Sequence, residues 1–300
     1  MELWIPITLV AAFFQNLRSA LQKHLKDRLS TSCATFARFL FALPFAVLYL
    51  GALHLITGEA VPRLGVPFAL YTMLGGLAQI MGTALLVSLF SLRNFAVGTA
   101  YSKTETAQTA VFGVVIVGES VSVTAAIAIL VSLGGVIALS TARTTFTPLN
   151  LVRQLTGRAA LTGMASGAGF GIAAVSYRAA ALSLGGDGFL LQAGYTLGCV
   201  LIFQTLVMGV YLKVREPGQI TALLGEWRVA IWVGVAGMVA SAGWFTAMTI
   251  QNAAYVRALG QVELVFTFIA SVVVFREKSN LIEIVGIGLI VLGILILILG

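Results

Sequence analysis

Two glutamates lie in apolar stretches of the sequence, where an ionisable side chain is rare and commonly faces a cavity or a partner. They are Glu105 and Glu263, which are 158 residues apart. Tyr101 and Gln108, four residues before and three after Glu105, share one helical face with it. A carboxylate on such a polar face can bind the amine of a cationic or zwitterionic solute, or it can carry a proton. We therefore expect Glu105 to contact a solute.

The surroundings of Glu263 are more apolar in the sequence, because Leu259 and Phe266 occupy the corresponding neighbouring positions. We expect this glutamate to serve the conformational change more than solute binding. A second interpretation remains open for both carboxylates. In that interpretation a fixed partner such as Lys103 or Arg257 neutralises each glutamate, and the pairs only hold helices together.

Four further residues in apolar segments are candidates for solute contact. Arg38 is about two turns inside its segment and close to Pro44, which can kink a helix and open space beside it. The other three are Gln79, Tyr195 and Trp244. A single amide or aromatic side chain can also bridge neighbouring helices, so these three are weaker candidates than Arg38.

The first apolar segment carries a polar stripe. Its members follow helical spacing and share a face: Gln15, Arg18, Ser19 and Gln22. Arg18 and Arg178 both lie in the last part of their segments, where a long basic side chain can reach the membrane interface without any role in function. For Arg18 we favour this interface position over a role in the pathway.

The composition is that of a membrane protein. Hydrophobic residues make up 59% of the 300 residues, charged residues make up 10%, and the mean hydropathy is +1.01. A soluble enzyme of this length needs far more charged side chains to cover its surface. The net charge of +7 would favour nucleic acid only if the basic residues were clustered, and they are not.

Ten apolar segments are each long enough to cross a bilayer core of about 30 Å as a helix. Their predicted bounds are 3–23, 32–57, 67–92, 95–117, 121–141, 159–183, 188–212, 227–250, 253–275 and 281–299. The segments are continuously apolar and do not alternate at every second residue, which excludes a porin-like barrel. The sequence predicts an all-α integral membrane protein.

The two halves of the sequence are related. A shift of 158 residues aligns the following pairs without a gap: Asn94 with Asn252, Ala96 with Ala254, Glu105 with Glu263, Glu119 with Glu277 and Gly135 with Gly293. Each half has five predicted spans, an odd number, so the second half must enter the membrane from the opposite side. We predict two inverted five-helix repeats, residues 1–142 and 159–300, joined by a linker at 143–158, with the solute site between them.

Basic residues mark one side of the membrane. They lie in or beside the odd-numbered loops: Lys23, Lys26, Arg28, Arg93, Arg143, Arg153, Arg158, Lys213, Arg215, Arg228, Arg276 and Lys278. Arg63 is nearly alone in the even-numbered loops. Because loops rich in Lys and Arg stay in the cytoplasm, both termini are predicted to be outside.

Enzyme chemistry finds little support in the sequence. His24 and His54 are the only histidines, and they lie toward the ends of segments. No cluster has the spacing of metal ligands, and Ser166 lacks a base that could activate it. A ridge of small residues at Gly163, Gly167 and Gly171 predicts close helix packing instead. We expect no enzymatic activity, no metal site and no cofactor.

Four short segments can be compared with known families: Ala34-Thr35-Phe36-Ala37-Arg38-Phe39, Ser91-Leu92-Arg93-Asn94-Phe95-Ala96, Gly118-Glu119-Ser120 and Arg276-Glu277-Lys278. They resemble the EamA family of the drug/metabolite transporter superfamily. The resemblance implies ten helices in two inverted repeats, in the bacterial inner membrane, that export small metabolites or drugs. The sequence departs from the family where a proline commonly lies early in the fourth and ninth helices, because Thr106 and Leu264 occupy those positions.

Two functions fit these observations. The first is a secondary transporter, in the exporting direction, that moves a small polar or amphipathic solute, cationic or zwitterionic, by alternating access. The alternative is a lipid-linked flippase or a passive facilitator on the same scaffold. The expected partners are a small-molecule solute, the lipid bilayer and, for coupled transport, protons. No nucleic-acid partner is expected.

Overall fold

The computed structural model describes residues 2–58, 60–89, 101–141, 157–186, 188–269, 272 and 279–300, and in these ranges the chain is helical, without strands. In chain order the helices are α1 (Trp4–Lys26), α2 (Thr31–Leu40), α3 (Leu43–Thr57), α4 (Val66–Leu89), α6 (Glu105–Phe112), the π-helix η1 (Gly113–Val117), α7 (Val123–Thr141), α9 (Arg158–Ser183), α10 (Phe189–Arg215), α11 (Gln219–Gly225), α12 (Trp227–Ile250), α13 (Ala253–Gly260), α14 (Val262–Ile269) and α15 (Leu281–Leu299).

Six helical segments are long and apolar enough to cross a membrane. They are Thr31–Thr57, Val66–Leu89, Arg158–Ser183, Phe189–Arg215, Trp227–Ile250 and Leu281–Leu299. Shorter apolar helices cover Glu105–Val117 and Val123–Leu139. The protein is therefore a multi-pass membrane protein. Helices lie within each of the ten predicted segments, but the count of ten spans and their division into two inverted repeats stay predictions.

The predicted second segment is divided in two. α2 ends at Leu40 and α3 begins at Leu43, with Pro44 in the first turn of α3. Proline lacks a backbone N–H and is tolerated at the start of a helix but not within one. The bend expected near Pro44 is thus a break between two helices, and Arg38 lies in the last turn before it.

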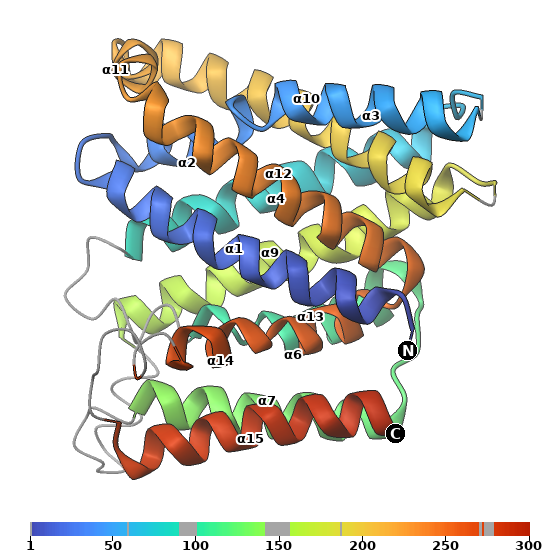
Figure 1. Ribbon diagram of the computed structural model, residues 1–300, viewed down its shortest axis with the longest axis vertical. Coiled ribbons are helices and arrows are strands. Elements are labelled where there is room, and N and C mark those ends of the chain that lie inside the picture. Colours follow the sequence, from blue (N-terminus) through green and yellow to red (C-terminus); the bar gives the residue numbers. More distant parts are fainter. Residues whose placement is uncertain are drawn as a thin grey trace.

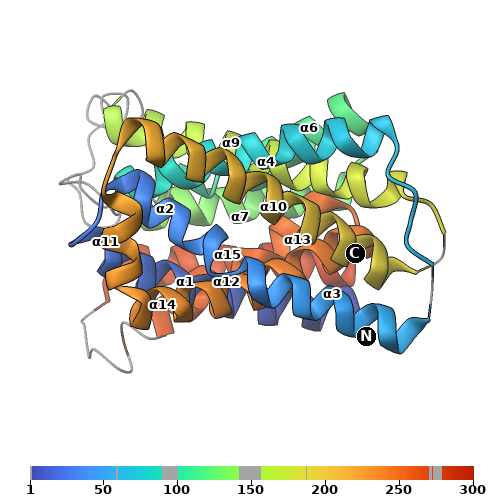
Figure 2. The same cartoon turned by 90° about the horizontal axis from the view of Figure 1, so that it is seen from above.

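The helices form a bundle with both termini at the same end (Figure 1). α11 lies at the opposite end, and Figure 2 shows the same separation from above. The closest pairings are α1 with α12, α4 with α9 and α7 with α15, while α6 packs on α9 and α3 on α10. The loop between α1 and α2 lies at the α11 end, since Arg28 donates to Glu226, which directly follows α11.

Glycines bring several helix pairs into backbone contact. On α7, a Cβ at Gly135 would lie 2.5 Å from the carbonyl oxygen of Gly286 on α15. On α15, a Cβ at Gly293 would lie 2.7 Å from the carbonyl oxygen of Ala128 on α7. The same shift of 158 residues relates Gly135 to Gly293 and Ala128 to Gly286. The two contacts are therefore reciprocal.

The glycine ridge of α9 packs closely, as predicted. A Cβ at Gly167 would lie 2.7 Å from the carbonyl oxygen of Ser102, and one at Gly171 would lie 3.1 Å from Thr109 Oγ1. These positions bring α9 into close contact with α6. Small residues allow this close approach of backbones inside a membrane.

Candidate functional site

Two helix breaks lie side by side in the centre of the bundle. A turn at Lys103 and Thr104 precedes α6, and Gln261 separates α13 from α14. Lys103 and Gln261 are 158 residues apart, so the breaks are at corresponding positions in the two halves. Interrupted helices at matching positions are typical of solute sites in transporters.

Each helix break is stabilised by a side chain that lies at or near the other helix break. Gln261 Nε2 donates to the carbonyl oxygen of Lys103 at 3.2 Å. Thr106 Oγ1 donates to the carbonyl oxygen of Arg257 at 3.4 Å. Broken helices expose carbonyls that the membrane interior cannot hydrate, and neighbouring side chains must satisfy them. The two breaks therefore depend on each other.

The breaks place both central glutamates at helix starts. Glu105 lies in the first turn of α6 and Glu263 in the first turn of α14, whereas Arg257 lies in the last turn of α13. Helix N-termini favour negative charge and C-termini favour positive charge. All three charges agree with this preference.

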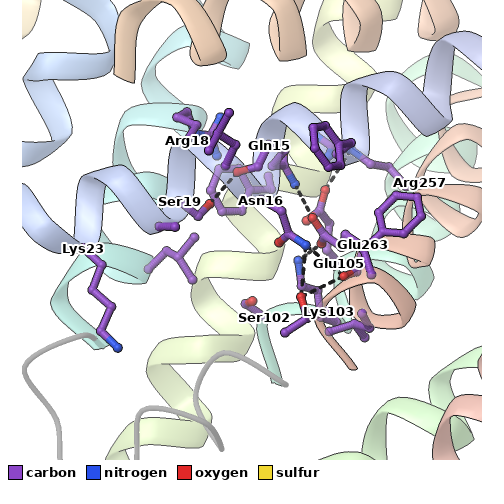
Figure 3. A pocket seen from close by; sticks show the side chains of 18 of the residues that line it. Gln15, Asn16, Arg18, Ser19, Lys23, Ser102, Lys103, Glu105, Arg257 and Glu263 are labelled. Atoms are coloured by element: carbon purple, nitrogen blue, oxygen red, sulfur yellow. Dashed lines mark hydrogen bonds and ion pairs between the residues drawn. The ribbon is translucent and has the colours of Figure 1, made fainter. Parts of the chain in front are cut away.

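Both glutamates are paired with cations from the other half of the chain. Arg257 Nε lies 2.8 Å from Glu105 Oε1, and Lys103 donates to Glu263 Oε1. Gln15 Nε2 adds a hydrogen bond of 3.0 Å to Glu263 Oε2. Figure 3 shows these side chains gathered at one end of the pocket, with Lys23 at the other. The fixed-partner interpretation thus describes the pairing in this structure.

A cavity of about 640 Å³ adjoins this cluster. Its lining residues are Phe13, Gln15, Asn16, Leu17, Arg18, Ser19, Ala20, Lys23, Leu86, Ser102, Lys103, Glu105, Leu139, Phe170, Arg257, Glu263, Leu264, Phe266 and Thr267. The volume suits a small organic molecule, and the mixture of apolar walls with a few polar groups is typical of a ligand site. The cavity reaches from the central ion pairs toward Lys23, at the α11 end of the bundle.

A small chamber of about 20 Å³ lies deeper in the bundle. Arg38, Gln79 and Trp244 line it, and Gln15, Phe170 and Arg257 line both the chamber and the large cavity. The chamber has room for about one water molecule. The two spaces are therefore adjacent parts of one polar interior.

Five of the eight predicted site residues come together here. Glu105 and Glu263 line the large cavity, while Arg38, Gln79 and Trp244 line the chamber. Arg38 Nη1 donates to Thr83 Oγ1 at 3.1 Å, and Gln79 Oε1 accepts from Tyr177 and Gln204. Gln79 also bridges α4, α9 and α10. The indole of Trp244 lies under the guanidinium of Arg257, with 4.6 Å from Cζ to the ring centroid.

The structure places the other three elsewhere. Tyr101 is buried but does not line the cavity or the chamber, and Tyr195 on α10 lines neither. Gln108 donates to Thr104 Oγ1 and to the carbonyl oxygen of Met164. Tyr101 precedes the helix break, so the continuous helical face assumed for it, Glu105 and Gln108 does not exist. The polar stripe predicted for Glu105 is wrong for this reason.

The predicted apolar surroundings of Glu263 also need correction. On α14 itself, Thr267 Oγ1 donates to the carbonyl oxygen of Glu263. Gln15 and Lys103 reach its carboxylate from other parts of the bundle, and Asn16 also donates to its backbone carbonyl. These partners are remote in sequence. The periodicity of one helix therefore could not reveal them.

The position of Arg18 differs most from the prediction. Its side chain is 3% exposed and lines the cavity, so it does not extend to the membrane interface. The stripe shared with Gln15 and Ser19 was the signal that could have placed it there. The side chain of Arg178 is also fixed by protein contacts. Its Nε lies 2.6 Å from Glu119 Oε1, and its Nη1 donates to the carbonyl oxygen of Gln251.

The Arg178–Glu119 pair joins α9 to the segment that follows η1, at the end of the bundle that carries the termini. Arg178 also donates to the carbonyl oxygen of Met248 at 2.6 Å, near the end of α12. Glu119 thus has a fixed partner at this end of the bundle. Glu277, its counterpart by the 158-residue shift, lies outside the described residues. Among the residues that the structure describes, no group of three His, Cys, Asp or Glu side chains could hold a metal ion.

Comparison with known proteins gives two findings. Residues 158–299 match the family model of the EamA-like transporter family, in agreement with the resemblance seen in the sequence. A solved structure, titled "Crystal structure of protein", aligns with a TM-score of 0.67 and 17% identity over 99% of this chain and 96% of that chain. At this identity the alignment shows a shared fold. Among curated proteins none matches.

Proposed function

Because residues 158–299 match the model of the EamA-like transporter family, we propose that this protein is a secondary transporter that moves a small solute by alternating access. In this cycle a central site faces one side of the membrane and then the other. The proposed site is the 640 Å³ cavity together with the helix breaks at its inner end.

One asymmetry carries the proposal. Thr109 and Thr267 are related by the 158-residue shift. Thr109 packs against Gly171 of α9 so closely that an added Cβ would lie 3.1 Å from its hydroxyl. Thr267 instead accepts a hydrogen bond from Asn16 of α1, and both residues line the open cavity. Corresponding parts of the two halves are thus closed in one half and open in the other.

Exchange of these two arrangements would produce alternating access. The α1–α14 side would close while the α6–α9 side opened, and the cavity would then face the end that carries the termini. The reciprocal glycine contacts between α7 and α15 support this cycle, because the repeat relation maps that pair onto itself. The pairings α1–α12 and α4–α9 support the cycle as well, since the repeat relation maps one of these helix pairs onto the other.

The direction of the cavity supports export. It extends to Lys23, beside the first basic loop, and the loop charges predict that this end is cytoplasmic. A cavity open to the cytoplasm is ready to accept a solute for export. We accordingly place the protein in the bacterial inner membrane with both termini outside.

The pairing of the glutamates changes the expected solute. A cationic or zwitterionic solute would need a free carboxylate, but Glu105 and Glu263 already hold Arg257 and Lys103. We assign these crossed pairs to the conformational change, because each pair joins the two halves and must rearrange when they move. Solute selection then depends on other residues of the cavity.

Solute counterflow in proteoliposomes tests the proposal. We would screen organic acids, amines and neutral solutes, first without a gradient and then with an imposed pH gradient, and compare wild type with Glu105→Gln and Glu263→Gln. Both substitutions should lower the rate, and Glu226→Gln, which alters an ion pair outside the cavity, serves as the matched control. Unchanged rates in both central variants would refute the assigned role. Equal flux with and without the gradient would favour the passive facilitator.

A further inference from the structure

Two buried arginines lack a carboxylate partner among the described residues. Arg18 is 3% exposed, and its Nε has no hydrogen-bond acceptor there. Arg38 is 4% exposed and donates one hydrogen bond, from Nη1 to the hydroxyl of Thr83. A buried charge without a counterion is unfavourable, so proteins normally pair such groups. These two guanidiniums therefore need an explanation.

The acidic residues that the structure describes do not supply the missing partners. The sequence has eleven acidic residues, and Glu105 and Glu263 are the two in the cavity, where both are paired. Six others are described and lie elsewhere: Glu2, Asp27, Glu119, Glu216, Glu226 and Glu283. The remaining three, Glu59, Asp187 and Glu277, fall in sequence between predicted spans. The charges of Lys103 and Arg257 are balanced by those of Glu263 and Glu105. Arg18 and Arg38 therefore remain as surplus positive charge among the described residues of this interior.

The two arginines line adjacent spaces. Arg18 lines the large cavity, Arg38 lines the adjacent chamber, and Arg257, Gln15 and Phe170 line both. A ligand group that enters from the cavity could therefore interact with both cations.

The packing around Arg18 provides space for its side chain. Gly237 of α12 lies against it, because a Cβ at that glycine would be 3.4 Å from Arg18 Cδ and 3.8 Å from the carbonyl oxygen of Arg38. A larger residue at position 237 would crowd the contact between α12, Arg18 of α1 and Arg38 of α2. The backbone thus leaves room for a guanidinium beside the cavity, although no protein carboxylate among the described residues meets it.

We propose that the solute is an organic anion whose carboxylate or phosphate group binds Arg18 and Arg38. The proposal rests on the transport function above and specifies its substrate class. A guanidinium presents a planar fork of N–H donors that matches the oxygens of both acidic groups. The anion supplies the negative charge that the buried site lacks.

The rest of the solute is apolar. Phe13, Phe170 and Phe266 line the cavity together with leucines, and these walls lie beside the basic groups. The volume of about 640 Å³ accommodates a ring or a short chain attached to the acidic group. An amphipathic organic anion therefore fits the chemistry of both regions.

Four ligands with one ring and different head groups test this assignment. Benzoate and phenyl phosphate distinguish the two anionic groups, and benzylamine and benzyl alcohol provide a cation and a neutral control. Each would be titrated against the full-length protein in detergent, with thermal unfolding as the readout. We expect at least one anion to raise the melting temperature, while the amine and the alcohol do not.

Substitutions identify where the anion binds. Arg18→Gln and Arg38→Gln should each weaken the apparent affinity for the stabilising anion about tenfold or more, since each removes hydrogen bonds to a charged group. Without ligand, both variants should melt at or above the wild-type temperature, because an unpaired buried charge is removed. Arg28→Gln, at an exposed ion pair, should bind as wild type does. If Arg18→Gln cannot be purified, Arg18→Lys retains the charge and should bind the anion with reduced affinity.

Several results would overturn the anion site. The first is that benzylamine stabilises the protein as much as the anions do. The second is that neither anion stabilises it. The third is that the Arg18→Gln/Arg38→Gln double variant binds the anion with unchanged affinity. Counterflow separates this test from that of the transport function. Anion binding without counterflow of any solute would refute transport and keep the anion site, whereas counterflow of the amine alone would refute the anion site and keep transport.

Discussion

Arg257 and Glu105 form an ion pair of 2.8 Å that joins the two halves of the chain. Arg257 lies in the last turn of α13 and Glu105 begins α6, so both charges also interact favourably with the helix dipoles. The pair lies at the inner end of the cavity, beside a second pair with the opposite arrangement between Lys103 and Glu263. Movement of one half relative to the other must therefore alter both pairs.

The first prediction concerns the energy of this pair. Glu105→Gln leaves Arg257 buried and unpaired, and loss of one partner of a buried ion pair commonly costs about 3–5 kcal/mol. The Glu105→Gln/Arg257→Gln double variant removes both charges and should be more stable than Glu105→Gln alone. Thermal unfolding of the purified variants measures the difference.

A matched control is available at the surface. Glu226→Gln breaks the pair with Arg28, whose side chain is 59% exposed, and should cost less than about 1 kcal/mol. If the central double variant were destabilised by the full sum of its two single substitutions, Glu105 and Arg257 would not be coupled. The crossed-pair description would then fail.

The second prediction concerns the packing of α9 on α6. Gly167→Ala should destabilise the protein by about 1–3 kcal/mol, the common cost of overpacking, because the new Cβ would meet a backbone oxygen at 2.7 Å. Gly134→Ala on α7 is the matched control, since nothing lies within 4 Å of a Cβ there. Equal melting temperatures for the two variants would contradict the close α6–α9 contact.

The third prediction concerns orientation in the membrane. In a chain without Cys33 and Cys199, a cysteine at position 28 should resist an impermeant thiol reagent added to intact cells, because it lies in a basic loop that is predicted to be cytoplasmic. A cysteine at exposed Ala60, in the next loop, should react. The reverse labelling pattern would place the termini inside and turn the cavity away from the cytoplasm.

The positions of the helices could be predicted well from the sequence. The segment predicted at 227–250 is α12, Trp227–Ile250, and the one predicted at 281–299 is α15, Leu281–Leu299. Continuous apolar runs decide these bounds because the bilayer demands them. The predicted close packing at Gly167 and Gly171 is confirmed for a related reason, since only small residues let helices approach so closely.

The arrangement of the site was less predictable. The helix breaks at Lys103 and Gln261 lie where no proline marks them, and they depend on hydrogen bonds from the opposite half. The partners of Glu263 likewise come from residues far away in sequence, such as Gln15. Residue type and periodicity identified the two glutamates, but only the tertiary structure could show which cations neutralise them.

The exchange between an open and a closed side is the central claim, and a reversible cross-link tests it most directly. Thr109→Cys and Gly171→Cys would join α6 to α9, since a Cβ at position 171 lies 3.1 Å from Thr109 Oγ1. The two single variants, Thr109→Cys and Gly171→Cys, cannot form this cross-link and serve as the controls.

The account predicts that oxidation of the 109–171 pair stops solute counterflow and that a reductant restores it, because α6 and α9 must separate once in each cycle. Oxidation of either single-cysteine variant should leave its counterflow unchanged. Undiminished counterflow in protein shown to be fully cross-linked between residues 109 and 171 would contradict the account.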